Sequence, residues 1–161
     1  MVDTKKSVRR SLRFATLDDL AAELDRIEAA ENAGTLRATG NWTAGQILTH
    51  IAAWIDYAYD GYPVKAPPFF IRWILRWMLK SALRDGLRPG VKIPGVKGGT
   101  TGAELVDTRS GIERLRRSIG RLSSNEPVKF ASPAFGEMTN EQRVTLNLRH
   151  AELHLGFLVL E

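Results

Sequence analysis

Apolar residues recur along most of the chain with the spacing of α-helices, and the pattern divides into about five segments. The first predicted helix begins at Thr16, has acidic residues in its first turn, and ends by Gly34. Leu20, Leu24 and Ile27 share one face of it, and the acidic residues occupy the other. This pattern is typical of a helix that packs into a bundle.

Two further helices are expected in the first half of the chain. The second begins at Thr43, where Thr43 and Gln46 have the spacing of a capping box, and it stops at Asp60 before a glycine and three prolines. The third covers roughly residues 69–83 and is rich in aromatic residues. A loop rich in glycine and proline follows over residues 86–102, and loops of this length are often lids or binding segments.

The second half of the chain adds two more helices. One is expected over residues 107–122, and the last runs from a second capping box at Thr139 to Leu160. Only weak strand patterns occur, near residues 91–93 and 128–130. We therefore predict an all-α fold: an antiparallel four-helix bundle with one accessory helix and a long Gly/Pro loop.

The chain has the size of one domain, and its charge is unevenly distributed. Residues 14–161 form the predicted helical domain, preceded by a basic arm over residues 1–13. Residues 65–97 hold eight basic residues and one acidic residue, so the remaining body is acidic although the formal net charge is +5. No helix-turn-helix, zinc-finger or RNA-binding sheet motif accompanies the basic segment, and we expect no nucleic acid partner.

The absence of cysteine excludes disulfides, thiolate zinc fingers, iron–sulfur clusters and cysteine nucleophiles. No secretory signal is completed, and no apolar run reaches the roughly 18–20 residues that span a bilayer. We expect a cytoplasmic protein without stable membrane insertion. A site built from soft side chains, or from side chains that titrate near neutral pH, must then use the three histidines.

All three histidines fall on inward faces of predicted helices. His150 and His154 lie four residues apart in the last helix, and this spacing lets two imidazoles bind one metal ion. His50 lies on the second helix near Trp54. The alternative interpretation is that each is a core histidine with local hydrogen bonds, since spacing alone does not bring His50 to the other two.

Familiar catalytic motifs are missing. Zinc proteases of the His-Glu-x-x-His type need a glutamate directly after the first histidine, but Ala151 stands there and Glu152 lies about 200° around the helix from His150. No Gly-x-Ser-x-Gly elbow of a serine hydrolase occurs. No residue can be assigned as a catalytic acid, base or nucleophile.

Two strings of residues resemble a known family. Residues 41–50 read Asn-Trp-Thr-Ala-Gly-Gln-Ile-Leu-Thr-His, and residues 148–154 read Leu-Arg-His-Ala-Glu-Leu-His. Together with residues 9–14 and 133–136, they resemble the DinB-like (damage-inducible) superfamily of four-helix-bundle metalloproteins, especially its small branch of uncharacterised bacterial domains. The likeness covers essentially the whole chain.

The resemblance implies a metal site. In the superfamily, one histidine of the second helix and two of the last bind a divalent metal, and the matching residues here are His50, His150 and His154. Zinc, nickel, iron or copper suits imidazole ligands. Because a ligating imidazole needs an acceptor for its other N–H, Gln46 and Asn147, each one turn before a histidine, are candidate partners; the alternative is that they cap or bridge helices.

The resemblance leaves the reaction open. Some relatives are thiol-dependent transferases or isomerases that use a low-molecular-weight bacterial thiol, so a metal-dependent, thiol-linked transferase acting on a small-molecule substrate is one hypothesis. A hydrolase that uses metal-activated water is the second. The alternative is a non-enzymatic bundle with a structural or vestigial metal site that acts in protein or membrane-surface association, for example as a homodimer.

The third predicted helix carries two stripes with i,i+4 spacing. The favoured interpretation is that its tryptophans pack against the bundle or a dimer partner while its basic residues are solvated. A basic amphipathic helix on a membrane surface, or an aromatic lid over a thiol or acidic substrate, is the alternative. The basic stripe is Arg72, Arg76 and Lys80, and the aromatic stripe is Trp73 and Trp77.

Overall fold

The computed structural model of the chain describes residues 2–4, 6–93, 96–124 and 126–161. Within that part it has five α-helices, a short 3-10 helix and a two-stranded sheet, so the predicted all-α class is confirmed with a small sheet added. The elements in chain order are α1 (Leu17–Asn32), β1 (Leu36–Ala38), α2 (Ala44–Asp60), α3 (Phe69–Asp85), η1 (Lys97–Gly99), α4 (Thr108–Ser123), α5 (Asn140–Leu155) and β2 (Leu158–Leu160).

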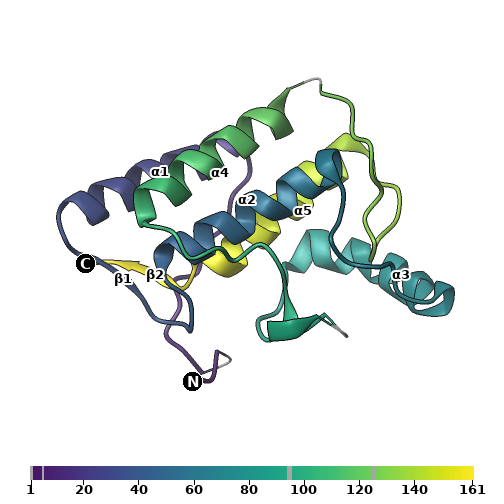
Figure 1. Cartoon of the computed structure of the whole chain (residues 1–161), viewed down its shortest axis with the longest axis horizontal. Helices are drawn as coiled ribbons and strands as arrows, with labels where there is room; N and C mark the ends of the chain where they lie inside the picture. The colour runs from purple at the N-terminus through teal and green to yellow at the C-terminus, as the bar shows by residue number, and fades with distance from the viewer. Residues whose placement is uncertain (1, 5, 94–95, 125) are drawn as a thin grey trace.

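Helices α1, α2, α4 and α5 form the bundle, and α3 lies to one side of it next to α5 (Figure 1). Helix α5 runs antiparallel to α2, as predicted. Helices α2 and α4, however, run in the same direction: the start of α4 packs on Gly45 near the start of α2, and Arg121 near its end accepts a hydrogen bond from Tyr59 Oη at 3.2 Å. The long connection through α3 makes this possible, because it returns the chain to the start of α2.

Polar side chains define where the helices begin. Thr16, Thr43 and Thr139 each accept a hydrogen bond from the backbone N–H three residues on, and the residue at that position bonds back to complete a capping box. Asp107 caps α4 in a similar way, accepting from the Ser110 N–H at 2.8 Å. The predicted starts of α2 and α5 are therefore confirmed.

Helix α2 is the centre of the core. Most of its residues are buried, whereas α1 and α4 each bury one apolar stripe against it or against each other. This arrangement removes the predicted inward faces from water and supplies the main stabilising term of the fold. The largest fully buried side chains are Tyr59, Leu20, Leu24, Ile27, Ile47, Leu48, Ile51, Ile55, Ile112, Leu115, Leu122 and Leu148.

Two glycines let α2 and the start of α4 approach closely. A Cβ on Gly45 would lie 2.1 Å from the carbonyl oxygen of Val106, and a Cβ on Gly111 would lie 2.9 Å from Cβ of Leu48. Only a residue without a side chain fits at Gly45, because the contact is with backbone that cannot turn aside.

The last helix ends earlier than predicted, at Leu155 instead of Leu160. After Gly156 the chain extends and forms β2, which pairs antiparallel with β1 in the register Leu36 with Leu160. The weak strand patterns at residues 91–93 and 128–130 form no strand. The two strands lie about 120 residues apart in the sequence, and each is only three residues long. Strands this short do not show an alternating pattern that would predict them.

The basic N-terminal segment is attached to the bundle through Arg10. Its backbone N–H donates to the carbonyl oxygen of Gly156 at 2.8 Å, and its guanidinium donates to the carbonyl oxygen of Leu158. The same guanidinium forms an ion pair with the buried carboxylate of Glu23 at 2.5 Å. This end of the chain therefore helps to hold the turn that follows α5.

Helix α3 stands apart from the core. Leu79 is its one buried residue, whereas Trp73 and Trp77 are 74% and 84% exposed. The predicted packing of the tryptophan stripe against the bundle is therefore wrong, because α3 turns its Leu79 side toward the rest of the molecule. Packing against a dimer partner, the other half of that interpretation, stays a prediction. No helix in the described part of the chain is long and apolar enough to cross a membrane.

Candidate metal centre

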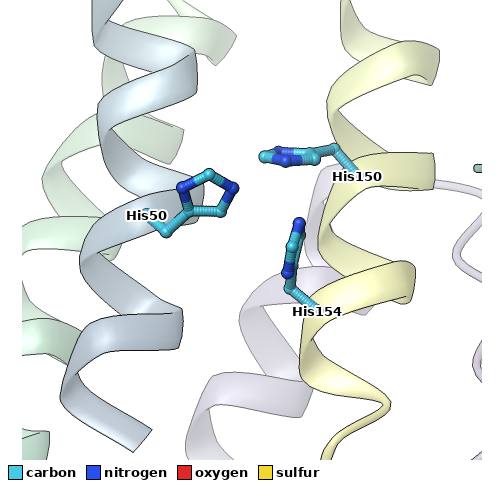
Figure 2. Close-up of side chains that lie close together, drawn as sticks. All are labelled: His50, His150 and His154. Atoms are coloured by element: carbon cyan, nitrogen blue, oxygen red, sulfur yellow. The ribbon is translucent and has the colours of Figure 1, made fainter. Parts of the chain in front are cut away.

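Three histidines from two helices meet between α2 and α5. His50 projects from α2 toward His150 and His154, which lie one turn apart on α5 (Figure 2). The ring centroids of His50 lie 4.9 Å and 4.5 Å from those of His150 and His154, and the two α5 rings are 4.6 Å apart. The prediction that His50 lies beside the histidine pair of α5 is therefore confirmed.

An ion network on the other side of α5 fixes its rotation. The carboxylate of Glu152 accepts a hydrogen bond from the backbone N–H of Phe14 at 2.6 Å and also pairs with Arg149. Arg149 in turn donates to the carbonyl oxygen of Phe14 at 3.0 Å. Both side chains are largely buried against the segment before α1. His150 and His154 lie on the opposite side of the helix and are therefore turned toward α2.

One ring nitrogen of His50 is engaged by the long loop. Its Nδ1 lies 2.8 Å from the carbonyl oxygen of Thr101. A carbonyl can only accept, so Nδ1 is assigned the proton and Nε2 keeps its lone pair. A backbone carbonyl on the far nitrogen is a common way to orient a metal-binding histidine.

The surroundings keep all three imidazoles neutral. Burial lowers the pKa of His50 to about 4, against a smaller upward effect of the bond to Thr101. Burial and repulsion from His50 lower the pKa of His154 to about 3. The pKa of His150 is lowered well below its ordinary value by burial and by the other two histidines. Neutral rings present lone pairs, which are what a metal ion requires.

The three histidines form a donor set that could hold a metal ion. One ring nitrogen from each histidine can be chosen so that all three lie within 4.8 Å of one another, and this is the one such group of His, Asp or Glu ligands found in the described residues. Around a tetrahedral zinc ion with bonds of 2.0–2.1 Å, nitrogen ligands are about 3.3 Å apart. Small side-chain movements therefore suffice to close the set on an ion.

Two tryptophans flank the histidines. Trp42, just before α2, stacks on His154 with ring centroids 5.6 Å apart and planes 18° apart, and its ring also lies 4.9 Å from His50. Trp54, one turn after His50, lies 5.9 Å from His150. Residues 41–50 include Trp42, and Trp54 was placed on the predicted second helix beside His50. Nothing in their spacing indicated that both would line the site.

Two buried polar atoms near the site have no hydrogen-bond partner among the described residues. They are the indole Nε1 of Trp54 and the hydroxyl Oγ1 of Thr101. Tyr57 and Tyr62 lie beyond Trp54, at ring distances of 5.7 Å and 6.1 Å. Buried polar atoms normally bond to something, so these two are available to a polar group bound beside the histidines. Thr101 was missed from the sequence because its loop has no period.

The two predicted partners of the histidines have other bonds. The side-chain oxygen of Gln46 accepts from the Thr43 N–H at 3.1 Å as part of the capping box, and Asn147 donates to the carbonyl oxygen of Arg143 at 2.9 Å. Thr101, instead of Gln46, is the acceptor for His50. A role for Gln46 or Asn147 beside a bound metal stays a prediction.

Comparison with known proteins places the chain in a family. A family model described as "Protein of unknown function (DUF1569)" matches residues 6–161. The search of curated proteins and the search of solved structures each gave no match. Since the family match spans nearly the whole length, the chain belongs to the DUF1569 family.

Proposed function

We propose that the protein binds one divalent metal ion through His50, His150 and His154 and uses it for chemistry on a small molecule. The observation that carries this proposal is that all three histidines of the chain converge between α2 and α5. The likeness to the DinB-like superfamily supports it, because the corresponding residues are ligands there. Zinc, nickel and iron all suit such a ligand set.

Three imidazoles leave room for further ligands, as in catalytic zinc sites with three protein ligands. A bound ion would supply Lewis acidity, which lowers the pKa of a thiol or of water. No carboxylate of the described residues belongs to the cluster, and Glu152 is held by Arg149 and Phe14. The lack of a carboxylate base affects both chemistries, but a free thiol already has a pKa of about 8.5, far below that of water. A thiol is therefore ionised more completely by the ion near neutral pH, and this favours thiol-linked transfer over hydrolysis.

The chain's own side chains would orient the substrate. The indole N–H of Trp54 can only donate, so it suits a carbonyl or carboxylate oxygen, whereas the Thr101 hydroxyl can donate or accept. Trp42 covers His154 and limits the access of water to that ligand. Together these residues favour a small substrate with at least one polar oxygen.

Metal binding is tested on protein purified without a histidine tag. Metal analysis and zinc titration are expected to give about one ion per chain for the wild type. His50→Ala and His154→Ala should each weaken zinc binding by at least about 100-fold, because removal of one of three ligands opens the site. The control is Arg117→Ala, an exposed change on α4. Unchanged zinc affinity in a His50→Ala/His154→Ala double variant would contradict the site.

The thiol branch is tested separately with cobalt-loaded protein. Addition of L-cysteine or glutathione should produce thiolate-to-cobalt charge-transfer absorption, and the S-methylated forms of the same compounds should not. If the loaded protein binds cobalt but neither thiol changes the spectrum, the thiol branch fails while the metal site stands.

A further inference from the structure

Helix α3 presents a large apolar surface to solvent. Its outward side chains, which we call the α3 apolar face, lie on the first three turns, and Trp77 is turned roughly 200° from the buried Leu79. Isolated exposed apolar residues are ordinary, but a contiguous cluster of this kind marks an interaction surface. The face consists of Phe69, Phe70, Trp73, Ile74, Trp77 and Met78, each more than half exposed.

The orientation of this face is fixed from the other side of the helix. The guanidinium of Arg76 donates to the carbonyl oxygen of Phe135 at 2.8 Å and also to that of Glu137. Leu79 is buried on the same side as this anchor. The helix is therefore attached along its inner flank, and the aromatic residues stay exposed to solvent.

Exposed basic residues lie on α3 and in the segments directly before and after it. Lys65, Arg72, Lys80 and Arg88 are exposed and form no ion pair with a described residue. Asp85, the one acidic residue in the segment 65–97, is already bonded by Arg84 at 2.7 Å. The surface thus combines exposed aromatic residues with a strong excess of positive charge.

We propose that α3 docks on the surface of an anionic phospholipid bilayer, lying parallel to it with the α3 apolar face inserted among the headgroups. Tryptophan and phenylalanine favour this interfacial zone, and lysine and arginine are attracted to anionic lipids. A second copy of the chain fits less well, because an identical contact would bring two strongly basic segments together. The proposal does not depend on the metal site.

The test measures sedimentation of the full-length protein with vesicles. Wild type is expected to bind vesicles of phosphatidylcholine mixed with phosphatidylglycerol, to bind pure phosphatidylcholine much more weakly, and to dissociate as salt is raised. The double variant Trp73→Ala/Trp77→Ala should lower binding at least about tenfold. Leu105→Ala, which removes an exposed apolar side chain elsewhere, should leave binding unchanged.

Two variants that remove the same amount of charge distinguish the effect of the basic residues near α3 on vesicle binding from the effect of overall net charge. Lys65→Gln/Lys80→Gln should weaken binding at least about tenfold, since each basic residue near an anionic surface contributes roughly fivefold. Arg117→Gln/Lys129→Gln removes the same charge from exposed positions off α3 and should have little effect. Circular dichroism should be the same for all variants, because every changed side chain is on the surface.

Three results would overturn the proposal. The first is no binding by wild type to the anionic vesicles, and the second is equal binding to neutral ones. The third is a dimer in sedimentation velocity that Trp73→Ala/Trp77→Ala dissociates, which would assign the α3 apolar face to a second copy of the chain.

Discussion

The Nδ1 atom of His50 lies 2.8 Å from the carbonyl oxygen of Thr101, a residue 51 positions further along the chain. This contact links the long loop after α3 to the buried centre of α2. It also sets the chemistry of the ring, because the nitrogen next to a carbonyl must carry the proton. The other nitrogen, Nε2, then keeps its lone pair, and it is the atom that the proposed metal site would use.

The tautomer of His50 follows from that contact. In metal-free protein near neutral pH, we expect His50 to be neutral with its proton on Nδ1. Long-range proton–nitrogen NMR correlations of the imidazole distinguish the two tautomers directly. A spectrum in which His50 is protonated at Nε2 would contradict the bond to Thr101 and the proposed ligand atom.

Gly45→Ala should destabilise the fold. The added Cβ would lie 2.1 Å from the carbonyl oxygen of Val106. The backbone of α2, or of the residues just before α4, must shift to relieve this clash. We expect a loss of about 1–3 kcal/mol in the free energy of unfolding, measured by urea denaturation.

Gly120→Ala is the matched control for this change. Gly120 also lies in a helix, but nothing stands within 4 Å of the Cβ it would gain. Alanine there should stabilise the protein by about 0.5–1 kcal/mol, because it lowers the backbone entropy of the unfolded chain. Equal losses at both positions would show that the close approach of α2 to α4 is not what requires Gly45.

The helices and the histidine pair could be predicted because their signals are local. Thr43 and Thr139 sit three residues before a glutamine, and His150 and His154 share a face by spacing alone. The position of His50 beside them was not fixed by spacing. It came from the family likeness, and the fold agrees with it.

Other features depend on contacts between distant segments. The bond from His50 joins it to Thr101, 51 residues further along, in a loop without a helical or strand pattern. From the sequence, Gln46, one helical turn before His50, was therefore the more obvious hydrogen-bond acceptor for the imidazole. The exposure of Trp77 could not be predicted either. The same i,i+4 spacing of apolar residues occurs in helices that pack on a bundle and in helices whose apolar face is exposed to solvent. Helical spacing predicts which side chains share a face of the helix, but it does not predict whether protein or solvent contacts that face.

Glu152→Gln should cost far more stability than loss of a surface ion pair. The Glu152 carboxylate is largely buried, pairs with the buried Arg149, and binds the backbone N–H of Phe14. Removing its charge leaves Arg149 buried without a counterion. We therefore expect the free energy of unfolding to fall by about 3–5 kcal/mol.

The control for Glu152→Gln is Arg116→Gln. Arg116 pairs with Asp25 at 2.7 Å and with Glu28 at 2.9 Å on the surface, and exposed pairs contribute at most about 1 kcal/mol each. Urea denaturation of both variants gives the comparison. If the two losses were equal, the buried network would not be what holds α5 in its rotation.

Acid should destabilise the metal-free protein in a window set by the histidines. In the folded chain the pKa of His50 is lowered to about 4 and that of His154 to about 3, whereas in the unfolded chain both return to about 6.5. The unfolded state therefore binds more protons as pH falls below about 6.5, so stability is complete above that pH and decreases toward pH 4.

The chain has no histidine outside the cluster, and ordinary carboxylates stay largely ionised above about pH 5. A decrease in stability between pH 7 and pH 5 must then come mainly from this site, and we expect about 1–2 kcal/mol for each histidine. Urea denaturation with a chelator present measures it. The triple variant His50→Gln/His150→Gln/His154→Gln should lose this decrease, because the histidines are gone. Burial raises the pKa of Asp56, so proton uptake there favours the folded state and acts in the opposite direction. An equally steep decrease in the triple variant would show that the acid sensitivity lies elsewhere.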